Sequence, residues 1–158
     1  AYLKAQVTNT SGRPMLRGRA NVFSGDAFVG ENILQTTGQG GTIDFPLGAD
    51  QDVRVVRTVI PKTETDGLVW KDDVTTYTQR IEIANYKKST IQIRIVDQVP
   101  KTRNEKIDID LISTDPQPAT KPDVDGILRW DVSIAPGKKQ TVTFSYRGKR
   151  PHNWQLFQ

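Results

Sequence analysis

Four stretches of the chain alternate strictly between apolar and polar residues. Isoleucine or leucine takes every second position of residues 91–95 and 107–111, and apolar side chains do the same in 128–134 and 142–146. A period of two places one side of a β-strand in a core and the other side in water. The pattern therefore predicts four strands of antiparallel sheets, with Trp130 buried in the core.

Weaker strand signals fill most of the remaining chain, and helical signals are nearly absent. No apolar period of 3.6 residues is sustained over three turns, whereas β-branched residues and Gly-, Asn- and Pro-containing turns recur. About ten short strands predict one all-β domain over residues 1–158. We expect an antiparallel β-sandwich with immunoglobulin-like packing, and a jelly roll is the alternative. The weaker strand candidates are residues 2–9, 19–23, 27–33, 42–45, 52–60 and 74–84.

Two polar segments are predicted to be connections rather than strands. Residues 115–122 contain three prolines, which cannot donate hydrogen bonds to a central strand, so we expect an exposed loop there. The polar residues after Pro100 separate two alternating stretches and are interpreted as a bend. Lys101 and Arg103 lie on this bend, and they are candidate contacts for a partner.

Composition narrows the classes of protein that fit. The 158 residues carry a net charge of +4, and the basic residues are scattered instead of forming the dense stripe typical of nucleic-acid binding, so no nucleic-acid partner is expected. No apolar run reaches the roughly 20 residues of a membrane-spanning helix. The chain has no cysteine, which removes disulfides, thiolate metal ligands and cysteine nucleophiles.

No catalytic constellation is visible in the sequence. His152 is the single histidine, and it lies near the chain end. Residues 38–41 are glycine-rich but lack the third glycine of a dinucleotide-binding fingerprint, and residues 123–126 lack the downstream glutamate of a calcium loop. We interpret the first as a flexible loop and the second as a turn. The expectation is a protein that is not an enzyme and that has no cofactor and no metal site.

Two tryptophans are candidate binding residues. Trp70 lies in the segment between two predicted strands and Trp154 in the C-terminal tail, where an exposed indole can stack on a sugar or anchor a partner. Asn9-Thr10-Ser11 matches the acceptor pattern for N-glycosylation. The binding candidates from the sequence are thus Trp70, Trp154, Lys101 and Arg103.

The order and spacing of eight stretches form a specific pattern: residues 9–12, 14–23, 27–30, 45–57, 96–107, 126–130, 136–137 and 144–147. Together these stretches resemble the C-terminal domain of mucoidy inhibitor A-like proteins, a domain of unknown function (DUF4139). The resemblance covers nearly the whole chain in the same order. Arg17 replaces a usual proline of the family, and the family's Asp-Gly turn is Ser24-Gly25-Asp26 here.

The resemblance implies that this chain is the C-terminal part of a longer protein, and that this longer protein is secreted or lies in the cell envelope. Together with the residues, it favours a non-catalytic interaction or structural module with an unknown protein or polysaccharide partner. A carbohydrate-binding module that uses Trp70 or Trp154 is the alternative. A glycan or peptide hydrolase is a further alternative, and it would require a cleft with paired carboxylates and raised pKa values.

Overall fold

The structure is a computed structural model that describes residues 1–66, 72–120 and 122–151. These residues form ten β-strands and no helix, and every strand pair is antiparallel. The predicted all-β fold with about ten strands is confirmed. The strands are β1 (Tyr2–Thr8), β2 (Gly18–Ser24), β3 (Ala27–Leu34), β4 (Thr42–Ala49), β5 (Val53–Asp66), β6 (Asp72–Asn85), β7 (Ile91–Gln98), β8 (Asp108–Asp115), β9 (Ile127–Ile134) and β10 (Lys139–Pro151).

The chain divides into two compact units, unit 1 (Ala1–Gln51) and unit 2 (Asp52–Gln158). The expectation of a single domain over residues 1–158 stays a prediction. In unit 1, β1 pairs with β4 and β2 pairs with β3. The amide of Asn32 on β3 donates to the carbonyl oxygen of Asp44 on β4 at 3.4 Å, which joins the two pairs. Val22 and Ile43 are the buried apolar residues of this unit.

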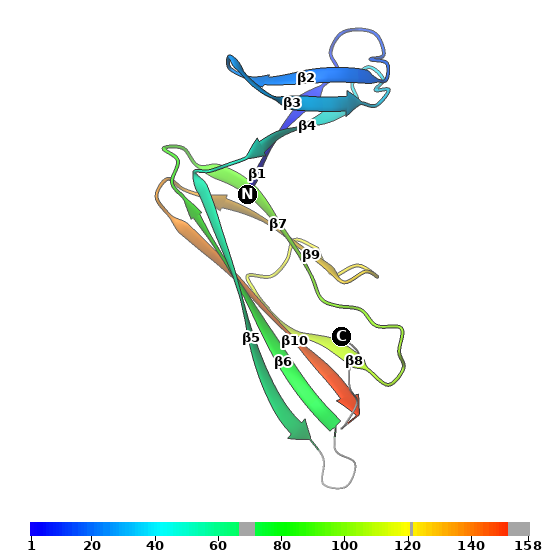
Figure 1. Cartoon of the computed structure of the whole chain (residues 1–158), viewed down its shortest axis with the longest axis vertical. Coiled ribbons are helices and arrows are strands. Elements are labelled where there is room, and N and C mark those ends of the chain that lie inside the picture. The colour runs from blue at the N-terminus through cyan, green and yellow to red at the C-terminus, as the bar shows by residue number, and fades with distance from the viewer. Residues whose placement is uncertain (67–71, 121, 152–158) are drawn as a thin grey trace. The chain divides into compact units, whose positions relative to one another are not determined.

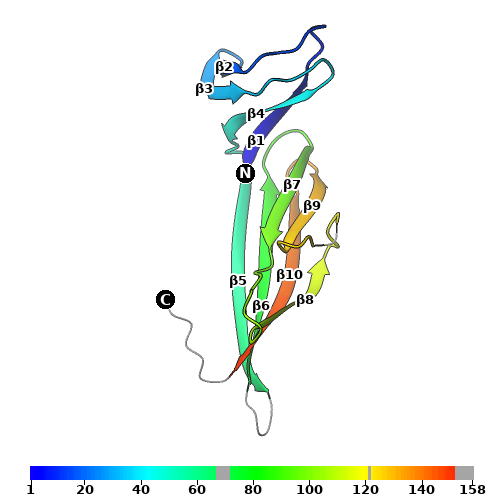
Figure 2. The same ribbon diagram turned by 90° about the vertical axis from the view of Figure 1, so that its right-hand side faces the viewer.

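Unit 2 contains a four-stranded sheet in the order β5-β6-β10-β8 and a two-stranded sheet of β7 and β9. Both sheets contribute to one hydrophobic core, so they pack face to face as two layers (Figure 2). Trp130 is 1% exposed, which confirms its predicted place in the core, and its indole N–H donates to the carbonyl of Pro116 at 2.9 Å. The core residues are Val53, Ile81, Ile83, Ile95, Val99, Leu128, Trp130, Ile134, Val142 and Phe144.

A bidentate ion pair ties the two layers together at one edge. Arg57 on β5 donates from Nε to Oδ2 of Asp97 on β7 at 2.8 Å, and from Nη2 to Oδ1 at 3.2 Å. The Asp97 side chain is only 14% exposed, and its carboxylate raises the pKa of the Arg57 guanidinium. The pair therefore fixes β5 against the second sheet with a defined geometry.

The two layers differ in length, and this difference creates the candidate site. Strands β5 and β6 have 14 residues and β10 has 13, whereas β7 and β9 have eight each. At about 3.4 Å per residue, the longest strands exceed the covering sheet by about 20 Å. Figure 1 shows β5, β6 and β10 continuing past the ends of β7 and β9. The connection that follows β7 lies over this uncovered part.

The sequence-based lengths of β5 and β6 were wrong. Residues 52–60 and 74–84 were predicted, but β5 continues through Pro61 to Asp66 and β6 begins at Asp72. The added segment of β5 is polar and shows no apolar alternation. It is nevertheless paired with β6 residue by residue, without a register shift, because the hairpin partner supplies the hydrogen-bonding ladder.

Candidate ligand-binding trough

The floor of the candidate site is the uncovered end of the four-stranded sheet. Tyr77 on β6 lies opposite Tyr146 on β10, and one row further along Thr75 lies between Thr63 on β5 and Gly148 on β10. Because side chains alternate along a strand, these residues share the face that carries the core. The two tyrosine rings are stacked, with centroids 5.2 Å apart and planes inclined by 22°. They form an aromatic platform on the sheet.

Gly148 leaves a hollow in this floor. It pairs with Thr75 on one side and Ile109 on β8 on the other. A Cβ atom at position 148 would meet the Thr75 carbonyl oxygen at 3.9 Å as its nearest neighbour, which is an ordinary contact. A side chain is therefore sterically acceptable here, and glycine keeps the space above the strand open.

The connection between β7 and β8 forms the wall. It is anchored where Val99 N–H donates to the Gly126 carbonyl at 2.9 Å. Short hydrogen bonds then shape the bend: Asn104 N–H donates to Thr102 Oγ1 at 3.0 Å, and Ile107 N–H donates to the Asn104 carbonyl at 3.0 Å. The predicted bend after Pro100 is thus confirmed, and it presents Thr102 and Ile107 to the cavity.

Floor and wall enclose an open trough of about 420 Å³. This volume falls in the range of small-ligand sites, about 300–1,000 Å³. The Thr63 and Thr75 hydroxyls hydrogen-bond to each other at 3.1 Å, and Arg150 pairs with Asp73 at 3.8 Å near one end. The trough is lined by Thr63, Thr75, Tyr77, Pro100, Thr102, Ile107, Ile109, Tyr146, Gly148, Lys149 and Arg150.

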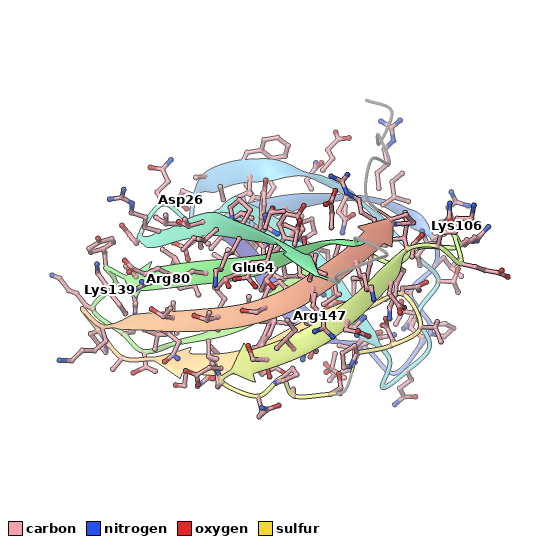
Figure 3. The ribbon with its side chains drawn as sticks, turned by 90° about the horizontal axis from the view of Figure 1, so that it is seen from below. Asp26, Glu64, Arg80, Lys106, Lys139 and Arg147 are labelled. Atoms are coloured by element: carbon pink, nitrogen blue, oxygen red, sulfur yellow. The ribbon has the colours of Figure 1, made fainter. Side chains whose placement is uncertain are left out.

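Lys101 and Arg103, which the sequence singled out, lie on the same connection but line a different cavity of about 350 Å³. That cavity shares Thr102, Ile107 and Ile109 with the trough, so the connection separates the two. Figure 3 shows Lys106 on this connection, at the opposite end of unit 2 from Lys139.

The other two predicted binding residues, Trp70 and Trp154, lie outside the described residues, as does His152.

Sequence reasoning missed Tyr77, Tyr146 and Gly148 as a group. Tyr146 was assigned to a strand and Tyr77 to a weaker one, but nothing indicated that their strands are neighbours. Gly148 carried the one usable signal, because a glycine within a β-favouring run often marks a place where something must approach the backbone closely.

The turn at residues 123–126 is confirmed. The Asp123 carboxylate accepts hydrogen bonds from the backbone N–H groups of Ile127 at 3.0 Å and Asp125 at 3.1 Å, and from Arg129 at 3.2 Å. These bonds, first of all the one from Ile127, hold the pKa of Asp123 below its ordinary value. The carboxylate therefore closes a turn before β9.

The N-glycosylation pattern at Asn9 does not present an acceptor in this structure. Asn9 is fully buried, and its side-chain nitrogen donates to the carbonyl oxygens of Arg13, Thr37 and Gly38 at 2.9–3.1 Å. Ser11, the third residue of the pattern, donates its hydroxyl to Asn9 Oδ1 at 2.7 Å. The asparagine is thus a structural residue of unit 1.

Ion pairs explain why three other carboxyl groups have lowered pKa values. A hydrogen bond from Lys4 lowers the pKa of Asp44, one from Lys139 lowers that of Glu82, and one from Arg94 lowers that of Asp131. In each of these three pairs, the cationic partner stabilises the carboxylate as an anion.

Within residues 1–66, 72–120 and 122–151, no group of three or more acidic or histidine side chains is arranged to hold a metal ion. In the same part of the chain, no helix has the length and hydropathy needed to cross a membrane.

Comparison with known proteins places the chain in a family. It is 24% identical to Protein F37C4.5 of Caenorhabditis elegans over 99% of its own length, and it spans about 30% of the length of that protein. No solved structure matches the chain. The model of the domain of unknown function DUF4139 matches residues 3–152, as the sequence resemblance implied. The chain therefore belongs to the DUF4139 family.

Proposed function

We propose that this chain is a non-catalytic binding module whose ligand lies in the trough beside Tyr77 and Tyr146. The trough itself is the observation that carries the proposal. Binding sites are typically concave and mostly apolar, with aromatic side chains and a few polar groups that fix orientation. The stacked tyrosines, the apolar wall and the threonine hydroxyls match this description.

The side chains of the trough favour binding over hydrolysis. A glycoside hydrolase uses two carboxylates across the scissile bond, and one of them has a raised pKa. The polar side chains that line the described trough are hydroxyls and cations. Asp123 and Asp131 have lowered pKa values instead and are engaged with Arg129 and Arg94. We therefore assign a binding role, with a protein or a polysaccharide as the class of partner.

A carbohydrate ligand is the second candidate, and the tyrosine platform favours it. Aromatic faces pack against the apolar face of a sugar ring, while nearby hydroxyls hydrogen-bond to it. In this version Tyr77 and Tyr146 take the role that the sequence analysis gave to Trp70 or Trp154.

A ligand panel read by thermal unfolding tests the proposal. The panel holds soluble polysaccharides, neutral oligosaccharides and peptides. A ligand that binds the native state adds about 2.7 kcal/mol of stability at a hundred times its dissociation constant. Gly148→Leu fills the trough, and Thr143→Leu adds the same side chain to the opposite face of the same strand. We expect at least one ligand to stabilise the wild type and Thr143→Leu but not Gly148→Leu. Equal stabilisation of all three proteins by every ligand that binds would disprove the trough as the site.

A further inference from the structure

We propose that two copies of this chain pair through β5, antiparallel to each other, so that their four-stranded sheets join into one. This inference does not depend on the trough or its ligand. β5 stands at one end of the strand order β5-β6-β10-β8, and no described strand pairs with its other side (Figure 2). An unpaired edge offers a row of backbone N–H and C=O groups to another strand.

The backbone groups that β5 offers follow from its pairing with β6. Tyr86 N–H donates to the Asp52 carbonyl at 2.8 Å, so residue 52 bonds towards β6. The bonding direction alternates along an antiparallel strand, and the register from Val53 to Asp66 runs without a shift. The odd-numbered residues of β5 therefore point their N–H and C=O groups away from β6. Pro61 agrees with this assignment, because it has no N–H to donate to β6.

The side chains near the middle of this edge are apolar and partly exposed. Val55, Val56, Val59 and Ile60 are 41–54% exposed. Even- and odd-numbered side chains of a strand lie on opposite faces, so these four residues flank the edge on both faces of the sheet. A neighbouring strand would cover part of each of them.

β8, the strand at the other edge, is protected in the ways that proteins commonly use. Its pairing with β10 contains a register shift, and it carries Asp108, Asp110 and Asp115. Bulges and edge charges discourage further pairing. Residues 53–60 of β5 contain no register shift, and Arg57, one of their two charged residues, is engaged by Asp97. β5 is therefore the edge that is open to a second strand.

The charges of β5 are complementary to those of a second copy in a register centred on Val59. In a pair related by a two-fold axis, Val59 lies opposite itself, and each residue lies opposite the one equally far beyond the axis. Arg54 then lies opposite Glu64 of the second copy, on the face of the sheet away from the core. The symmetry produces this contact twice, and opposite charges across two strands stabilise their pairing.

Neighbouring registers lose this match. Moving the centre one residue towards the N-terminus would set Arg54 opposite Lys62, and moving it two residues would set Arg57 opposite itself. Like charges directly opposite each other destabilise a strand pair. Moving the centre one residue the other way would set Glu64 opposite Val56. The sequence of β5 thus favours one register for a second copy.

Pro61 and Lys62 are compatible with this register. Pro61 lies opposite Arg57 of the second copy, so its carbonyl accepts the Arg57 N–H and only the return bond is missing. Lys62 Nζ is paired with Glu64 Oε1 at 2.6 Å within its own strand, which offsets its charge. The proline therefore interrupts the new ladder at one bond on each side of the axis and does not block it.

Cross-linking through a single introduced cysteine tests the register, because the chain has no cysteine of its own. Val59 belongs to the outward-bonding set, so its two copies would form a hydrogen-bonded pair with Cα atoms about 5.5 Å apart, within the range that a disulfide spans. We expect Val59→Cys to become a covalent dimer on oxidation in the whole chain. Ile112→Cys is the control: Ile112 is 51% exposed on β8, at the other edge, and this variant should remain monomeric.

Multi-angle light scattering on the whole chain tests the association itself. We expect a dimer for the wild type and for Ile112→Lys. Val59→Lys places two ammonium groups at the axis and should weaken dimerisation at least about tenfold. Arg54→Glu should also weaken it, and Arg54→Glu combined with Glu64→Arg should restore it. Urea unfolding checks that each variant is folded.

Three results would overturn the inference. The first is a wild type that stays monomeric up to about 1 mM. The second is an assembly larger than a dimer, or a dimer that Val59→Lys and Arg54→Glu leave unchanged. The third is a dimer in which Ile112→Cys cross-links as readily as Val59→Cys, which would place the contact at the other edge of the sheet.

Discussion

Asn9 and Asn85 occupy equivalent positions in two copies of one turn-locking motif, one copy in each unit. Both side chains are buried, and each side-chain nitrogen donates to three backbone carbonyls. Each side-chain oxygen accepts a backbone N–H two residues further on. The acceptors of Asn9 are Arg13, Thr37 and Gly38, and those of Asn85 are Ser89, Ile134 and Ala135.

The backbone bonds of the two copies correspond as well. Asn9 N–H donates to Gly41 and its carbonyl accepts from Gly40, while Asn85 N–H donates to Lys138 and its carbonyl accepts from Gly137. Gly40 and Gly137 both have positive φ, at 77° and 66°. The glycine-rich residues 38–41, interpreted as a flexible loop, are therefore a defined turn. The sequence shows no repeat, because only the asparagine and one glycine are common to both copies.

Asn85→Ala should lower the free energy of unfolding by about 2–4 kcal/mol, because several buried backbone groups lose their partner at once. Tyr86→Ala is the control: Tyr86 is the next residue and is 60% exposed, so we expect a change below about 0.5 kcal/mol. Urea unfolding followed by circular dichroism measures both. Equal effects of the two substitutions would show that the asparagine network does not stabilise the unit.

Gly126→Ala should be much more damaging than Gly137→Ala. Both glycines have positive φ, which costs an alanine about 1–2 kcal/mol. At Gly126 an added Cβ would also overlap the Val99 carbonyl oxygen, whereas at Gly137 nothing lies within 4 Å. Thermal unfolding of the two variants compares them. A Gly126→Ala variant as stable as Gly137→Ala would contradict the described contact between this turn and the start of the trough wall.

Arg57 and Asp97 should show a favourable coupling of about 1–2 kcal/mol in a double-mutant cycle. The bonds are bidentate and Asp97 is largely buried, so solvent screens this pair less than an exposed one. The cycle uses Arg57→Met and Asp97→Asn, alone and combined, with unfolding free energies from urea titration. Additive effects would mean that this pair does not hold the two layers together.

Stability should fall in acid. Asp123 and Asp131 have lower pKa values in the folded chain than when unfolded. Their stabilisation is therefore complete above the unfolded value, near about 4, and is lost as the pH falls through the folded values. Once the pH falls below about 4, we expect the midpoint of unfolding to decrease. The decrease should be less steep in the Asp131→Asn variant, which has no carboxyl group at this position. A midpoint that stays constant from neutral to acidic pH would refute the assigned ion pairs.

Strands with a clean apolar alternation were predictable from sequence, and strand length was not. Residues 128–134 were expected as a strand and β9 covers Ile127–Ile134, because the alternation itself reports burial on one face. Residues 61–66 carry no such signal. They extend β5 because β6 pairs with them, and pairing depends on a partner strand rather than on local composition.

The candidate site was predictable only in part, for a related reason. The bend with Lys101 and Arg103 follows from Pro100 and the polar residues beside it. The tyrosine platform could not be predicted from the sequence. Tyr77 and Tyr146 are brought together by the strand order β5-β6-β10-β8, and no local pattern encodes which strands become neighbours.

We propose the trough as the binding surface of this domain. Two-dimensional amide NMR of the whole chain, titrated with the panel ligand that stabilises it most, tests this directly. We predict that the shifted amides belong to Tyr77, Tyr146, Gly148 and residues 101–107. Shifts confined to unit 1 or to the opposite face of the four-stranded sheet, with Gly148 unchanged, would contradict it.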